Sequence, residues 1–147
     1  MFLFFPFYNF FKSNINIKRW FGQHGNNKDM RVSLISPEGK EVILVSNKCE
    51  QQNFNCGFDD ASDENVKCPL NNGKVYKPQQ LLEAFNGDEL EGTWIFQIAD
   101  QKAGNGGRLE GLQIEFCSNQ VLDNPYIVRN EKLSIGWNSS PVISSGR

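Results

Sequence analysis

Two alternating segments joined by a glycine-rich turn constrain the fold of this chain more than any other feature. Apolar residues occupy every second position of both, namely Trp94, Phe96 and Ile98 in the first and Leu112, Ile114 and Phe116 in the second. Because side chains alternate across a strand, each set faces one side. The stretch 103–107, Ala-Gly-Asn-Gly-Gly, can adopt the positive φ angles that a hairpin loop needs. The pattern predicts a closing β-hairpin of a sandwich, with Asp100 at its rim.

Alternation elsewhere also indicates an all-β chain. It predicts strands at 14–20, 30–35 and 41–46, with turns at 22–28 and around Pro37-Glu38-Gly39. Residues 77–85 are the one stretch that could form a short helix, because Pro78 suits a first turn. Residues 47–75 form a long irregular segment, and such loops are usually functional or held by cross-links.

Composition excludes several classes of partner. The 147 residues allow one domain with a tail, and the net charge of −2 gives no reason to expect nucleic acid or an anionic membrane.

The aromatic run 1–11 is too short for a membrane helix and lacks the flanking residues of a signal peptide. We therefore expect no membrane insertion of this segment. We favour a natural domain that begins further upstream, since an exposed aromatic run would aggregate.

Several motifs in a fixed order resemble the P domain, or Homo B domain, of proprotein convertases over roughly residues 15–117. They are Asp29-Met-Arg-Val32-Ser-Leu34-Ile-Ser-Pro37-Glu-Gly39, Phe58-Asp59-Asp60, Tyr76-Lys-Pro78, Leu82-x-x-Phe85-Asn86-Gly87, Gly92-Thr93-Trp94, Asp100 and Gly104-Asn-Gly-Gly-Arg108-Leu109. The resemblance implies an antiparallel, jelly-roll-like β-sandwich that lacks its N-terminal strand. It divides the chain into an atypical apolar segment (1–14), the sandwich (15–118), and a linker with the start of a following β repeat (119–147).

The same resemblance implies a function. P domains follow a subtilisin-like catalytic domain and support its folding and calcium dependence. We therefore expect a non-catalytic accessory module of a secreted or cell-surface protein. Its partners would be neighbouring domains of the same polypeptide, including a subtilisin-like serine endopeptidase that performs proteolysis. The alternative is an adhesive or protein-interaction module of a multidomain bacterial surface protein, which the repeat-like tail 121–147 favours.

No residue of the chain is a candidate for catalysis or for binding an organic cofactor. His24 is the single histidine, and neither a Gly-x-Ser-x-Gly motif nor a phosphate-binding loop is present in the sequence. A catalytic triad needs a nucleophile, a base and an orienting acid. We interpret His24 as a solvated turn residue. Trp94 shares a strand face with Phe96 and Ile98, which favours core packing over sugar binding.

Four cysteines, Cys49, Cys56, Cys68 and Cys117, form an even set in a small β domain. This favours disulfides in an oxidising compartment, and three pairings are possible. A zinc site is the alternative, but the chain has no Cys-x-x-Cys pair and only one histidine.

Acidic residues lie at the expected strand ends and loops. Calcium requires six to eight oxygen ligands, which loops rich in Asp, Asn and Gly supply. Some P domains carry calcium in such loops, so the best candidate ligands are Asp59, Asp60 and Asp100. The weaker candidates are Asp29, Asp63, Glu64 and Asp88. The alternative is that these carboxylates are only solvated loop residues.

Overall fold

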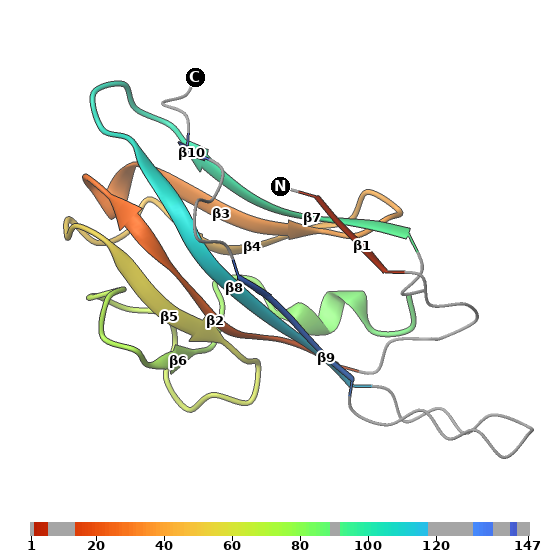
Figure 1. The fold of residues 1–147 in the computed structure, drawn as a ribbon. Helices are drawn as coiled ribbons and strands as arrows, with labels where there is room; N and C mark the ends of the chain where they lie inside the picture. The colour runs from red at the N-terminus through yellow and green to blue at the C-terminus, as the bar shows by residue number, and fades with distance from the viewer. Residues whose placement is uncertain (1, 6–13, 89–91, 118–130, 137–141, 144–147) are drawn as a thin grey trace, which may run out of the picture.

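The computed structural model describes residues 2–5, 14–88, 92–117, 131–136 and 142–143, and arranges their strands in two facing sheets (Figure 1). The strands are β1 (Phe2–Phe5), β2 (Asn14–His24), β3 (Met30–Ile35), β4 (Glu41–Ser46), β5 (Phe54–Phe58), β6 (Val75–Tyr76), β7 (Gly92–Asp100), β8 (Gly107–Cys117), β9 (Glu131–Gly136) and β10 (Val142–Ile143). One sheet has the order β1-β7-β3-β4 and the other β10-β8-β2-β5-β6, with β9 also paired to β8. The predicted all-β sandwich is confirmed.

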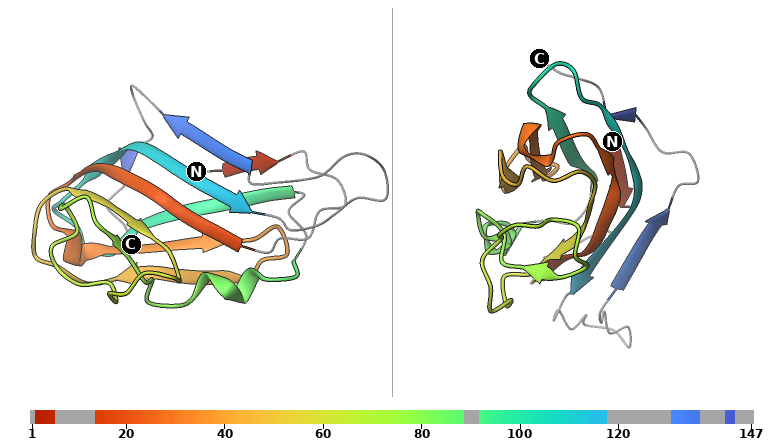
Figure 2. Two further views of the ribbon diagram at one scale, coloured as in Figure 1. Left: turned by 90° about the horizontal axis from the view of Figure 1, so that it is seen from below. Right: turned by 90° about the vertical axis from the view of Figure 1, so that its left-hand side faces the viewer.

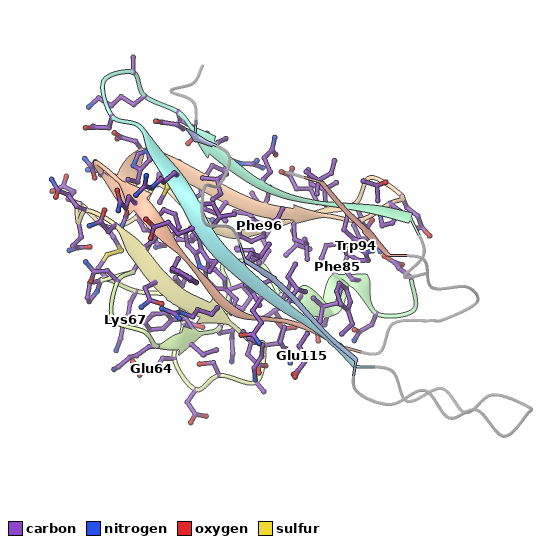
Figure 3. All side chains as sticks on the ribbon, viewed as in Figure 1. Glu64, Lys67, Phe85, Trp94, Phe96 and Glu115 are labelled. Carbon is purple, nitrogen blue, oxygen red and sulfur yellow. A yellow bond between two sulfur atoms is a disulfide. The ribbon has the colours of Figure 1, made fainter. Side chains whose placement is uncertain are left out.

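The core lies between the two sheets and is rich in aromatic rings. Trp20 of β2 stacks on Phe54 of β5 with ring centroids 4.2 Å apart. Phe85, from the short 3-10 helix η2 (Leu82–Phe85), meets Trp94 of β7 edge-on at 5.1 Å. Figure 3 shows Phe85, Trp94 and Phe96 in this interior. Trp94 has no exposed surface, so its predicted place in the core is confirmed.

The connection between β7 and β8 crosses from one sheet to the other, so the predicted hairpin is wrong (Figure 2). Strand β7 pairs with β3, whereas β8 pairs with β2. Gly104 in the connection has a φ of +107°, as expected for a glycine turn. Local alternation and turn residues suit a hairpin and a crossing connection equally. Pairing with strands distant in the sequence decides between them.

The segment 47–75 contains strand β5 and the first residue of β6, which alternation did not reveal. Strand β5 lies between β2 and β6 and directs Phe54, Cys56 and Phe58 inward. Its sequence, Phe-Asn-Cys-Gly-Phe, includes residues that are weak strand formers, which hid the pattern. Gly57 is required because a Cβ there would lie 2.6 Å from the carbonyl oxygen of Lys18. Strand β2 also continues to His24, through the first part of the predicted turn.

Segments near both ends of the chain extend the sandwich. Residues 2–5, predicted to be part of an atypical apolar segment, form β1 and pair with β7. Strands β9 and β10, the described parts of 119–147, pair with β8. A following β repeat stays a prediction. In the described part of the chain, no helix is long and apolar enough to cross a membrane.

Candidate functional site

A buried polar network lies at the end of the sandwich where β2, β7 and β8 meet. His24 ends β2 and Asp100 ends β7, and both side chains are fully shielded from solvent. His24 Nε2 lies 3.0 Å from Asp100 Oδ2. Gly107, the residue opposite His24 on β8, must be a glycine because a Cβ would collide with the carbonyl oxygen of Gln23. The interpretation of His24 as a solvated turn residue is therefore wrong.

Hydrogen bonds fix the tautomer of His24. Its Nδ1 accepts from the backbone N–H of Asn26 at 3.1 Å, so the proton resides on Nε2 and is donated to Asp100. The other oxygen of Asp100 accepts from the backbone N–H of Lys102 at 3.2 Å. A general base needs a ring nitrogen that can take a proton from a substrate. Both nitrogens of His24 are engaged, so this network holds strand ends together.

Asp29 joins the same end of the molecule. Its Oδ2 accepts from the side-chain amide of Asn105 at 3.1 Å, and its carbonyl oxygen accepts from the backbone N–H of Gln101 at 2.8 Å. These bonds tie the β7–β8 connection to the 3-10 helix η1 (Asn27–Asp29). Two buried amide oxygens here, Asn27 Oδ1 and Gln51 Oε1, meet no hydrogen-bond donor within the described residues.

Asp59 and Asp60 follow β5 and organise a different end of the molecule. The two carboxylate oxygens of Asp60 accept from the backbone N–H groups of Leu82 and Glu83, at 2.8 and 2.7 Å. These bonds satisfy donors at the start of η2 that lack partners within the helix. Asp59 Oδ1 accepts from the backbone N–H of Ala61 at 2.8 Å. Both acids hold loop backbone in place.

The structure does not bring Asp59 or Asp60 together with Asp100. Asp59 follows Phe58, which pairs with Ile17, whereas Asp100 contacts His24 further along β2. At about 3.3 Å per residue these positions are roughly 20 Å apart. Among the described residues, no group of three His, Cys, Asp or Glu side chains is arranged to hold a metal ion. The joint site predicted from the sequence is not formed, and calcium binding itself stays a prediction.

The weaker candidate ligands have other surroundings. Asp63 is exposed. Glu64 forms ion pairs with Lys67 and Lys74, and the hydrogen bond from Lys67 lowers the pKa of Glu64 (Figure 3). Asp88 pairs with Lys40 Nζ at 2.8 Å. Lysine ammonium groups, rather than further carboxylates, therefore lie beside Glu64 and Asp88.

The cysteines divide into a cross-link and a buried thiol. Cys49 and Cys68 form a disulfide, which also removes both from the zinc alternative. Cys56 is free and faces the core opposite Trp20, and burial raises the pKa of its thiol to about 12. The prediction that Cys56 forms a disulfide is therefore wrong. The side chain of Cys117 lies outside the described residues.

These features define a β-sandwich whose loops are held by internal polar contacts. The chain belongs to the proprotein convertase P-domain family, whose family model matches residues 19–116. P domains are accessory domains of multidomain proteins that also contain a catalytic domain. No curated protein and no solved structure matches the chain.

One feature of the sequence indicates the buried network, and it is the position of Asp100 along β7. Asp100 has the same parity as Trp94, Phe96 and Ile98, so it continues the inward-facing side of β7. A carboxylate on that side is costly to bury unless hydrogen-bond donors reach it. The parity therefore predicts a buried, partnered Asp100 in place of the expected rim position, although it does not identify His24 as the partner.

Proposed function

We propose that this chain is an accessory module that packs against a subtilisin-like serine endopeptidase domain of the same polypeptide, outside the cell, and supports its folding. The observation that carries the proposal is the P-domain match over residues 19–116. Two features support it. The single histidine has both ring nitrogens engaged, so it offers no base. The Cys49–Cys68 disulfide suits an oxidising compartment.

A surface pocket beside β5 and β6 is the contact face that we propose for the catalytic domain. Val75 is its exposed apolar side chain, and Lys18 and Asp59 are among its polar residues; Ile17 and Phe58 also line the pocket, but their side chains are buried in the core. Its volume is about 260 Å³. Val75 is 43% exposed. An exposed apolar residue surrounded by polar residues suits a contact between domains of one chain.

The test is co-expression with the endopeptidase domain of the parent protein, with secreted proteolytic activity as the readout. Omitting the P domain should abolish secretion of active enzyme. Val75→Asp should reduce it strongly, because a charge would be buried at the contact. Leu81→Asp is the matched control, since Leu81 is similarly exposed at 38% but does not line the pocket. Unchanged activity without the P domain would contradict the accessory role, and equal loss in both variants would contradict the contact face.

An adhesive or interaction module is the second candidate. Strands β9 and β10 favour it, because they lie beyond the P-domain match and continue the β structure of the chain. The flanking reading frame discriminates between the two. A catalytic Asp, His and Ser set upstream supports the endopeptidase partner, whereas tandem β domains support the adhesive module.

A further inference from the structure

Loops within the P-domain match cover two outer edges of the sandwich. The edge of β4 accepts hydrogen bonds from the backbone N–H groups of Gln79 and Gln80, which bond to the carbonyl oxygens of Leu44 and Ile43 at 2.8 and 2.9 Å. Beside β6, Ser62 Oγ donates to the carbonyl oxygen of Val75 at 2.8 Å. The matched domain therefore protects these edges by itself, as soluble sheet proteins commonly do.

The other two edges belong to β7 and β8, and segments outside the match cover them. Strand β1 pairs with β7, opposite residues 92–95. Strands β9 and β10 follow one another along β8, opposite residues 111–116 and 107–108 respectively (Figure 2). Residues 2–5 and 131–143 both lie beyond the family match at 19–116.

We propose that the outer edge of β8 is an acceptor for antiparallel strands, and that β9 and β10 of the same chain are its occupants. The register supports this choice. Leu133 lies opposite Ile114 and Ile135 opposite Leu112, and both β8 residues are buried. Residues directly opposite each other share a face of the sheet, so these two apolar positions of β9 coincide with buried positions of β8, while Glu131 lies opposite Phe116.

The length of this edge supports the need for a cover. Strand β8 is 11 residues long, and an uncovered edge of that length would be a template for association with another chain. The segment that follows the P domain thus serves as a built-in cover for this edge.

Two neighbouring proline substitutions in the full chain test the proposal. In an antiparallel pair, adjacent residues direct their N–H groups to opposite sides of the strand, so only one of Leu133 and Ser134 donates to β8. Proline removes the N–H and fixes φ. Leu133→Pro and Ser134→Pro should therefore differ, and Leu133→Ala controls for the loss of the leucine side chain.

Amide hydrogen exchange along β8 is the readout, with light scattering for the oligomeric state. One proline variant should speed exchange of the β8 amides that face β9 by roughly tenfold or more, while the β2-facing amides stay protected and show that the domain remains folded. Equal exchange in both variants, or free exchange of these amides in the unaltered chain, would overturn the proposal. A monomeric unaltered chain supports pairing within one chain. A dimer that dissociates in one proline variant would instead assign the strand to a second copy.

Discussion

Acidic residues gather at both the His24 end and the Asp60 end of the sandwich, but the two ends use them differently. Asp29 and Asp100 are 6% and 3% exposed, and their donors come from residues distant in the sequence, such as Asn105 and His24. Asp59 and Asp60 are half-buried and accept from the backbone of Ala61 and of the first residues of η2. The buried Asp100 thus joins two strand ends through a side-chain donor, whereas the half-buried Asp60 joins its loop to η2 through backbone amides 22 and 23 residues away.

Removing the buried acid should have the largest effect. Asp100→Ala leaves the Nε2–H of His24 and the N–H of Lys102 without an acceptor, so we expect a loss of about 2–4 kcal/mol in the free energy of unfolding. A urea titration measures it. Asp63→Ala, at an exposed site, is the control and should change stability by less than about 0.5 kcal/mol. A loss below about 1 kcal/mol in Asp100→Ala would erase the contrast between the two ends.

Removing the half-buried acid Asp60 should lower the free energy of unfolding by a smaller amount. Asp60→Ala removes two acceptors at the start of η2, and we expect a loss of about 1–2 kcal/mol, as for other helix-capping residues. The loss should be the same in millimolar calcium and in chelator, because the carboxylate oxygens bond to backbone amides. A loss that appears only in calcium would show that Asp60 is a metal ligand and would confirm the sequence-based prediction for this residue.

The reactivity of the free thiol of Cys56 tests whether the core between the two ends is shielded from solvent. Cys56 should resist alkylation in the folded protein at pH 8 and react in denaturant, whereas Cys49 and Cys68 should react only after reduction. Mass spectrometry of peptides measures this. Burial raises the pKa of Cys56 from 9.0 to about 12, so its contribution to stability is intact below pH 9 and is lost as pH rises toward 12. In Cys56→Ala that loss should be absent. Rapid labelling of the folded protein would mean that β5 is open to solvent.

The smallest effect concerns a surface pair away from both ends. The hydrogen bond from Arg31, followed by that from Ser33, lowers the pKa of Glu41 below its usual 4.5. A lowered folded-state pKa gives stability that is present above pH 4.5 and is lost as pH falls. Glu41 is about one-third exposed, so the contribution is below about 1 kcal/mol. Glu41→Gln should show a smaller drop in stability between pH 7 and pH 3 than Glu38→Gln, the control. Equal drops would contradict the pairing.

Local pattern predicted much of the fold but few of its long-range contacts. The strands at 30–35 and 41–46 were predicted with the bounds that the structure has, because alternation between turns is a local signal. The β7–β8 connection and strand β5 depend on pairing with β2 and β3, which no local pattern encodes.

The same limit applies to the candidate site. Loop acids were predicted to be calcium ligands, from the oxygen chemistry of the loops and the resemblance to P domains. In the structure Asp100 bonds to His24, 76 residues away in the sequence. The partners of Asp60 are backbone amides of η2, which any sequence provides. The partners of Asp100 and Asp60 are determined by burial and by which residues lie nearby in the fold. Residue types alone show neither of these.

The disulfide between Cys49 and Cys68 has a consequence for how the domain withstands cleavage of its chain. It spans β5 and the first part of the exposed connection to β6, including Asp63 and Lys67. A single cut of the chain anywhere between the two cysteines leaves both fragments covalently joined. The residues of β5 then stay close to their contacts in the core. A module that works next to an endopeptidase could thus be nicked on this loop and remain one molecule, and the cut would be visible on a gel only after reduction.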